Sequence, residues 1–328
     1  RGCEDHVDGT THGSNKIMVK QTAFVFAKPH ADLPAVHAVM KTKFDEVGIN
    51  VLKEGDISGK SIDENKYIDQ HYYAIASKAT ILTPDKLNIP TDKFKDQFGE
   101  EWSKVLEDGR AFNAMDACTK LGVDAVALDK IWGKAKKAGK LIKFGGGFYC
   151  GYLENDAEDK PLATPIYTFN AFFMEMRGKF TSADAHIHYF LVEYDSDTLK
   201  WADFRGKVLG PTDPAAAPAD ALRGIISADW EKLGLSGPCN TGDNAVHASA
   251  SPFEGLAEQM NWLQMKIEEN PFGAALLKAG IPEDTIKAWS VDPQVKIAGD
   301  KKGSIFDQLE DMDFQECLDT CTTLYKMQ

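Results

Sequence analysis

The chain has 328 residues, a length typical of two domains or of one domain with a large insertion, and long enough to bury a core without disulfides. No run approaches 18 consecutive apolar residues, which argues against a membrane-spanning helix. The formal net charge of -13 argues against specific nucleic-acid binding and requires a local cationic pocket for any anionic nucleotide. Six dispersed cysteines without a CxxC pair predict reduced thiols rather than a zinc site.

The first quarter of the chain predicts a loose arm followed by alternating strands and helices. Residues 1–17 are polar and rich in glycine and threonine, as expected of an arm. The apolar run 21–27 predicts a buried strand that ends at Lys28-Pro29. Apolar spacing over 33–47 predicts a helix closed by Gly48. A second strand and a second helix are predicted over 49–53 and 61–78.

The middle of the chain has a different pattern and predicts a mostly helical inserted subdomain over 79–164. The expected elements are three helices and a strand interrupted by three glycines, over 94–106, 114–121, 123–138 and 141–153. The charged, proline-containing end of the segment predicts a linker. A lysine-rich face near Trp132 is either a patch for an anionic partner or a solvated helix face, and consists of Lys130, Lys134, Lys136, Lys137, Lys140 and Lys143.

The second half returns to mixed helix and strand. The predicted order is a helix, a strand, a loop-rich segment and a helix, over 169–180, 186–194, 209–244 and 253–267. The remaining residues, 276–328, predict a C-terminal extension of short helices and loops. Short helices and strands that return to one sheet are typical of an α+β sandwich.

Polar side chains gather in and beside the glycine- and proline-rich loops of the third quarter. They are Thr212, Arg223, Asn244, His247, Ser249 and Glu258. Small neighbours leave room for a ligand at His247, and loops on a rigid scaffold often hold functional sites. Each residue also has a structural interpretation, such as a surface ion pair for Arg223 or a solvated helix face for Glu258.

Together with Lys28-Pro29 and the stretch 70–72, this set resembles the nucleoside diphosphate kinase family. The matching segments follow the family's order and cover roughly 20–78 and 166–268. Three spacings follow the family pattern: Thr212 to Arg223, Asn244 to His247, and His247 to Glu258.

The resemblance implies a ferredoxin-like α+β sandwich with an antiparallel sheet. The sandwich would be discontinuous, over 18–78 and 165–275, with the insertion between its two parts. The segments 1–17 and 276–328 would be its arm and its extension. Family members are often oligomers, so a homo-oligomer or a subunit of a larger assembly is expected. A cytoplasmic location is expected, with an organelle after leader removal as the alternative.

The resemblance also implies a ping-pong transfer of the γ-phosphate of ATP to a nucleoside diphosphate, through a phosphohistidine at His247. Glu258 would fix the tautomer of the ring, and Lys28, Tyr72 and Ser249 would complete the catalytic group. Phosphate oxygens and developing charge need cations in such a transfer.

The nucleotide itself would be held by a second group of residues. Phe169 would stack on the base, and the expected polar contacts are Lys28, Arg205, Thr212, Arg223 and Asn244. Mg²⁺ would be held mainly by the phosphates and water, so no protein metal ligand is expected.

The sequence departs from the family pattern at several positions. Gly206 stands where the family has a second arginine, although Arg205 and Lys207 flank it, and Ala74 replaces an acid after the His-Tyr pair. These departures favour a second hypothesis. In it the chain is a weakly active or inactive structural or adaptor protein that docks in a larger assembly through its insertion and extension.

Overall fold

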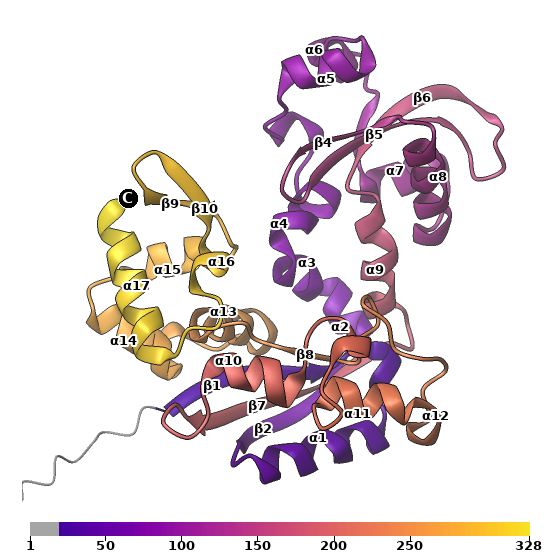
Figure 1. Ribbon diagram of the computed structural model, residues 1–328. Helices are drawn as coiled ribbons and strands as arrows, with labels where there is room; N and C mark the ends of the chain where they lie inside the picture. Colours follow the sequence, from indigo (N-terminus) through magenta and orange to yellow (C-terminus); the bar gives the residue numbers. More distant parts are fainter. Residues whose placement is uncertain (1–19) are drawn as a thin grey trace, which may run out of the picture.

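The structure is a computed structural model that describes residues 20–328, so the arm expected over 1–17 lies outside it. One antiparallel sheet, in the order β2-β7-β1-β8, forms the base of the molecule (Figure 1). Its strands are β1 (Lys20–Ala27), β2 (Asn50–Ser58), β7 (His186–Asp195) and β8 (Val246–Ala248). β1 is central and almost wholly buried, as its continuous apolar run requires. This is the strand order of a ferredoxin-like α+β sandwich, which confirms the predicted fold class.

One face of the sheet packs against α1 (Pro34–Glu46) and α11 (Leu222–Ala228). The core between them contains Val25, Met40 and Ile226, all fully buried. α1 starts at a proline, whose fixed φ and missing N–H suit the first helical position. The connections add short helices: η1 (Pro29–Ala31), α10 (Trp201–Asp203), η4 (Phe204–Leu209), η5 (Pro214–Ala216) and α12 (Trp230–Leu233).

The other face of the sheet packs against α13 (Pro252–Leu263) and a group of helices that leads into the insertion. Phe24, Phe26 and Trp262 form the core on this side. α13 approaches β1 closely, because a Cβ added at Gly255 would lie 3.0 Å from the carbonyl oxygen of Thr22. The other helices here are α2 (Gly59–Glu64), α3 (Tyr67–His71), α4 (Tyr73–Ala76), η2 (Ser77–Ile81) and α9 (Phe172–Thr181).

The inserted subdomain combines helices with a second sheet, in the order β3-β6-β5-β4. The strands are β3 (Ala111–Asn113), β4 (Leu141–Gly145), β5 (Phe148–Asn155) and β6 (Pro161–Phe169). β6 therefore extends past the boundary expected at residue 164, and the segment expected to be a linker forms the β5-β6 hairpin. The helices are η3 (Pro84–Lys86), α5 (Thr91–Phe98), α6 (Trp102–Glu107), α7 (Ala114–Leu121) and α8 (Ala125–Lys137).

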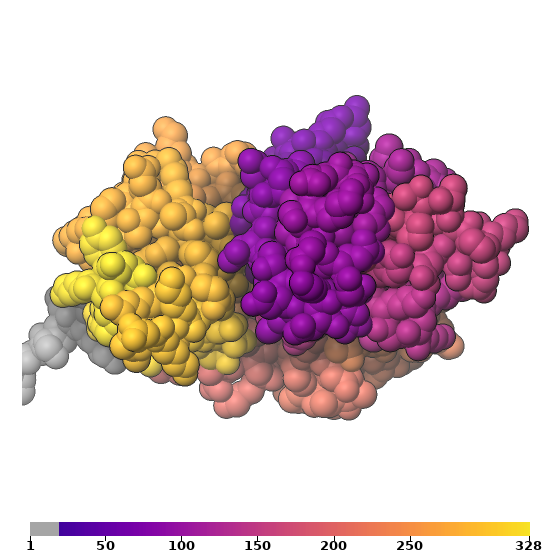
Figure 2. Space-filling model, turned by 90° about the horizontal axis from the view of Figure 1, so that it is seen from above, coloured from indigo at the N-terminus to yellow at the C-terminus, as the bar shows by residue number. Residues whose placement is uncertain are grey.

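The C-terminal extension packs on α13 and stands beside the inserted subdomain above the sheet (Figures 1 and 2). Its core includes Phe253 and Leu256 from α13 together with Phe272, Trp289 and Leu309. The extension is therefore continuous with the sandwich core. η6 (Ile267–Glu269) comes before the predicted start of the extension at residue 276, and α14 (Pro271–Lys278) crosses it. The elements beyond are α15 (Glu283–Trp289), β9 (Gln294–Ala298), β10 (Lys301–Ser304), α16 (Ile305–Leu309) and α17 (Phe314–Met327).

Two simpler expectations concern cysteines and membrane spans. The cysteines within residues 20–328 are free thiols, as predicted. None of the described helices is both long and apolar enough to cross a bilayer.

Candidate functional site

His247 lies in the middle of the short edge strand β8, opposite Phe26 of β1. Its neighbours Val246 and Ala248 point into the core of the α1 side, so alternation along the strand sends the His247 ring to the α13 side. There the ring stacks on the Phe26 ring, with 4.7 Å between the centroids. The strand and the aromatic floor together fix the position of the imidazole.

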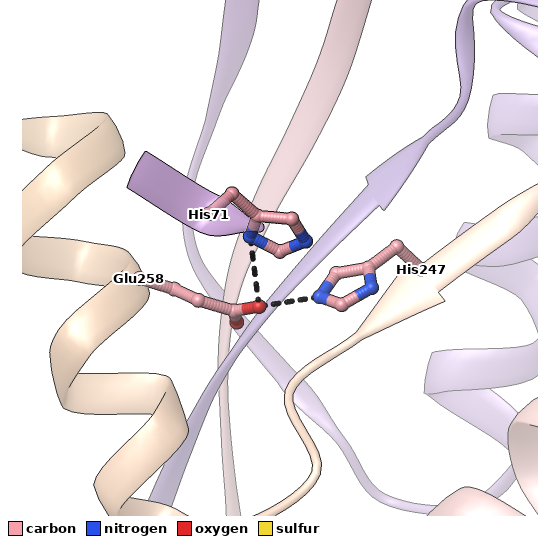
Figure 3. Close-up of side chains that lie close together, drawn as sticks. All are labelled: His71, His247 and Glu258. Carbon is pink, nitrogen blue, oxygen red and sulfur yellow. Dashed lines mark hydrogen bonds and ion pairs between the residues drawn. The ribbon is translucent and has the colours of Figure 1, made fainter. Parts of the chain in front are cut away.

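Glu258 on α13 connects His247 to Ser249, and Figure 3 shows its carboxylate facing the rings of His247 and His71. Its Oε1 lies 2.5 Å from Nε2 of His247, and its Oε2 lies 2.5 Å from the Ser249 hydroxyl oxygen. That same hydroxyl oxygen accepts a hydrogen bond from the backbone N–H of Phe24. Ser251 caps the start of α13, because its hydroxyl oxygen accepts a hydrogen bond from the Glu254 N–H. This cap fixes where the helix that carries Glu258 begins.

His71 completes this cluster, although it was not among the predicted catalytic residues. Its Nδ1 lies 3.4 Å from Oε1 of Glu258 and accepts a hydrogen bond from the Trp262 indole N–H at 3.3 Å. The His71 ring meets the His247 ring edge-on. The only signal in the sequence was its place before Tyr72 in the family-like stretch, because its partner Trp262 is far along the chain.

Burial and nearby cations keep the two imidazoles neutral. Burial lowers the pKa of His247 well below its usual value, and Lys28, Arg223 and Arg205 lower it further. Burial, then His247 and Lys28, lower the pKa of His71 in the same way. A neutral imidazole carries one N–H, so the hydrogen bond to Glu258 determines which ring nitrogen of His247 keeps a lone pair.

The carboxyl of Glu258 is also shifted, in the opposite direction. Burial raises its pKa to about 8, although the Ser249 hydrogen bond and the Arg205 charge act against that rise. When Glu258 is ionised it accepts the Nε2–H of His247, which leaves Nδ1 with its lone pair. Within residues 20–328, this Nδ1 makes no hydrogen bond. An unprotonated nitrogen beside several cations can attack an electrophilic, anionic group such as a phosphoryl group.

The three side chains are close enough to be considered as a metal centre. One ligand atom from each of His71, His247 and Glu258 lies within 4.8 Å of the others. However, ligands at about 2.0–2.1 Å around a tetrahedral ion lie more than 3 Å apart, whereas the His247 and Glu258 atoms are at hydrogen-bond distance. The Trp262 N–H also uses the lone pair of His71. The group is therefore described best as a hydrogen-bonded cluster.

Arg223 lies beside this cluster, but several of its guanidinium N–H groups are engaged by backbone carbonyl oxygens. Its guanidinium donates to the carbonyl oxygens of Val246 and Gly210, with three contacts of 2.8–3.2 Å. Burial, followed by the charge of Arg205, lowers its pKa to about 10. Arg223 thus holds β8 against the end of η4 and adds positive charge next to His247.

Lys28 directly follows β1. Its Nζ lies 3.5 Å from the carbonyl oxygen of Gly242, and its backbone N–H donates a hydrogen bond to the carbonyl oxygen of Ala245. Burial, and then Arg223, lower its pKa to about 8. A lysine held near such a charge loses its proton more readily than a surface lysine, so its charge at the site depends on pH near neutrality.

Asn244 and Thr212 are brought together near the same end of β8. The Asn244 amide donates to the backbone oxygen of Thr212 at 3.0 Å, and its own Oδ1 is buried with no hydrogen-bond partner among residues 20–328. A buried acceptor of this kind is suited to a hydroxyl or N–H donor of a ligand. Tyr72 is half-buried, and the low polarity around its phenol, together with the charge of Glu258, raises its pKa to about 12.

Two of the residues expected to hold the nucleotide are placed differently. Phe169 ends β6 and is fully buried in the core of the inserted subdomain, against Trp102 and Phe148, so the expected stacking on a base is wrong. The aromatic run that contains it pairs with β5 instead of starting a helix. Arg205 binds Glu310 at 2.6 Å and Asp311 at 2.8 Å, both from the extension.

A pocket of about 440 Å³ opens beside His247, between the α3–α4 segment, α13 and the extension. Ala74, one of the departures noted in the sequence, lies in its wall. The sides formed by α13 and the extension carry acidic side chains, namely Glu254 on α13 and Asp292 and Asp307 in the extension. Burial, and then the neighbouring Glu258, raise the pKa of Glu254 to about 8. The pocket is thus acidic on the extension side, whereas the cations lie towards β1 and η4.

No family model matches the chain, and no curated protein matches it. Solved nucleoside diphosphate kinases align with it. The apo enzyme of Encephalitozoon cuniculi, in its cubic crystal form, is 14% identical with a TM-score of 0.34, over 74% of this chain and 88% of that chain. The enzyme of Pyrobaculum aerophilum is 16% identical with a TM-score of 0.36, over 77% of this chain and 99% of that chain. Likeness at this level concerns the fold and says nothing about the activity of this chain.

Proposed function

We propose that the chain is a nucleoside diphosphate kinase-like phosphotransferase that uses Nδ1 of His247 as its nucleophile. The observation that supports this most is the hydrogen-bonded line from Ser249 through Glu258 to Nε2 of His247. This line stabilises the tautomer whose Nδ1 lone pair is available, in a ring that stays neutral because it is buried among cations.

In the first half-reaction the Nδ1 lone pair attacks the γ-phosphorus of a nucleoside triphosphate. The bond from that phosphorus to the bridging oxygen breaks, and the nucleoside diphosphate leaves with the electron pair. Glu258 keeps its hydrogen bond to the Nε2–H and offsets the positive charge that develops on the ring. In the second half-reaction a terminal oxygen of another diphosphate attacks the phosphorus and restores the free imidazole.

Other residues of this chain would position the phosphates and the sugar. Lys28 and the unused N–H groups of Arg223 would neutralise phosphate oxygens, and the Thr212 hydroxyl would donate to them. The unpartnered Oδ1 of Asn244 would accept from a sugar hydroxyl. Mg²⁺ would arrive with the nucleotide, bound by its phosphates and water, and would neutralise charge on the transferring group.

The test is transfer of label from γ-labelled ATP to purified protein and then to added GDP. We expect label on the wild type that is lost in acid, kept in base and passed to GDP, and no label on His247→Ala. The Glu254→Gln variant, which changes a half-buried acid of the same helix that forms no hydrogen bond with His247, should still be labelled. A wild type that binds ATP but takes up no label would contradict the proposal.

A non-catalytic adaptor is the second candidate, and one observation favours it. Arg205 is bound by carboxylates of the extension, and the pocket beside His247 is lined by further acids. Carboxylates repel triphosphate, so a chain of this kind would keep the fold and dock in a larger assembly through its added segments. Nucleotide binding without labelling of His247 would support this candidate.

A further inference from the structure

A second pocket, of about 640 Å³, lies in the inserted subdomain between α8 and the sheet that contains β4 and β5. It shares no lining residue with the pocket beside His247. Its walls are apolar and aromatic, and its rim is charged. The wall residues are Trp132, Leu141, Ile142, Tyr149 and Phe172, and the charged ones are Asp129, Lys136 and Lys143.

Gly133 indicates that this space is kept open. The residue lies within α8, where glycine costs about 1 kcal/mol relative to alanine. A Cβ at this position would meet no atom within 4 Å, so no contact in the fold requires a glycine there. By contrast, a Cβ at Gly151 on the facing strand would lie 2.6 Å from the Trp132 ring. Gly151 is needed for packing, whereas Gly133 only leaves room in the pocket.

Trp132 supplies a polar group without a partner. The residue is 5% exposed, and its ring lies against Gly151. Within the described part of the chain the indole N–H forms no hydrogen bond, and its nitrogen is still reached by solvent. A ligand in the pocket that carries an acceptor would satisfy this donor.

The lysines of the face differ in their pairing. Lys134 pairs with Asp159 and Lys140 pairs with Glu154. Lys136 and Lys143, the two that line the pocket, form no ion pair with any residue from 20 to 328. Lys143 lies over the ring of Tyr149, at 5.5 Å from its centroid. In a chain of net charge -13, two unpaired cations at the edge of an aromatic pocket favour an anion.

We propose that this pocket binds a small organic anion with a flat aromatic body. The body would lie among Phe172, Tyr149 and Trp132, the anionic group would reach Lys136 and Lys143, and Gly133 would leave the room for it. Aromatic walls with a few placed polar groups are typical of small-molecule sites. Asp129 at the same rim disfavours anions that carry several charges, so a singly charged group fits best.

The experiment compares two fluorescent probes of similar shape, anilinonaphthalene sulfonate and the uncharged N-phenyl-1-naphthylamine. Gly133→Leu fills the pocket while improving helix propensity, so it is expected to fold. Lys136→Gln with Lys143→Gln removes the charge at the rim. Lys130→Gln with Lys137→Gln is the matched control, because it removes the same charge from α8 outside the pocket.

We expect one sulfonate bound per chain. Affinity should fall at least about tenfold in Gly133→Leu and in the rim variant, stay unchanged in the control, and be lower for the uncharged probe. Equal affinity for both probes, or unchanged affinity in Gly133→Leu, would overturn the proposal. Displacement by 1-naphthoate identifies a carboxylate ligand, and displacement by cyclic AMP alone, whose phosphodiester is singly charged, identifies a phosphate ligand. Displacement by neither would also overturn it.

Discussion

Glu258 controls a single proton on which the activity of His247 depends. Below its pKa of about 8 the carboxyl holds a proton and donates it to Nε2, so the proton of the neutral ring moves to Nδ1. Above that pKa the carboxylate accepts from Nε2–H, and Nδ1 is free to attack. Lys28 acts in the opposite sense, because it loses its charge as pH rises through about 8.

We therefore predict a bell-shaped pH profile for kcat/KM with a maximum near pH 8. Its acid limb follows Glu258 and its alkaline limb follows Lys28, since kcat/KM reports groups of the free enzyme. Steady-state rates over pH 6–10 measure it. Lys28→Arg keeps a charge at all these pH values and should remove the alkaline limb. A profile that is flat across pH 7–9 in the wild type would contradict the assignment.

Glu258→Gln should lower the rate of phosphohistidine formation by about one to two decades. The loss corresponds to one charge-assisted hydrogen bond, about 1.5–3 kcal/mol. Single-turnover labelling measures it, and the acid limb of the pH profile should disappear in the same variant. Glu254→Gln is the control, one turn earlier on α13 and without contact to His247. Equal losses in both variants would show that Glu258 matters only as one of several carboxyl groups in the pocket, and not through its hydrogen bond to His247.

Part of the site was predictable from residues that lie close together along the chain. The rest depends on contacts between residues far apart in the sequence. Ser249, His247 and Glu258 were predicted together because they lie close along the chain and the spacing from His247 to Glu258 follows the family pattern. The partners of Arg205 come from the extension, more than 100 residues away, and no local pattern predicts such a pairing. The same holds for the contact of His71 with Trp262.

Among the elements, α13 is the helix that contacts the sheet, the site and the extension, so a shift of this helix would affect all three. Its Gly255 lies against β1, where a Cβ would be 3.0 Å from the Thr22 oxygen and 3.4 Å from the Ser249 hydroxyl oxygen. A methyl group here would push the helix away from the sheet. Since Glu258 is on the same helix, the distance from its carboxylate to His247 would change as well.

Gly255→Ala should destabilise the protein by about 1–3 kcal/mol, the usual cost of overpacking. Gly133→Ala in α8 is the matched change, because its Cβ meets open space and alanine favours helix. It should stabilise the protein by about 0.5–1 kcal/mol. Urea unfolding of both variants at one pH gives the comparison. A stabilising Gly255→Ala would mean that α13 can move away from β1 at no cost.

Elements with a clear period were predictable, and those that depend on partners were not. β1, α1, β7 and α13 follow apolar runs or helical spacing, and all four are present near the predicted residues. β6 was divided between a linker and a helix, because its residues form a strand by pairing with β5 and β3, which no local pattern predicts. The second sheet was therefore missed, although one of its segments, 141–153, was expected to be strand.

For the whole molecule, the extension contributes to the fold rather than trailing from it. It shares a core with Phe253 and Leu256 of α13, and the Asp311 N–H donates to the carbonyl oxygen of Ala250 close to His247. The Gln21 side chain at the start of β1 also binds Asp313 and Phe314. These contacts tie the site to the final third of the extension.

A chain ending at residue 275 should therefore lose the folded sandwich. Its removed segment includes Trp289, Leu309 and Cys321 of the shared core, so α13 would expose an apolar face. Calorimetry and near-UV circular dichroism should show no cooperative transition. As a control, Ile297→Ala removes one half-buried side chain of the extension and should only lower the transition temperature. A truncated chain that melts cooperatively and labels at His247 would contradict this view.

The pocket beside His247 has walls that belong to two separately packed bodies. One wall precedes the insertion, at Tyr72–Ile75, and the other belongs to the extension, at Ser290–Asp292 and Phe306. A ligand that contacts both walls links the two bodies, so part of its binding free energy stabilises their relative position. Saturation with nucleotide should then slow amide hydrogen exchange on both sides at once, including in residues that never contact the ligand.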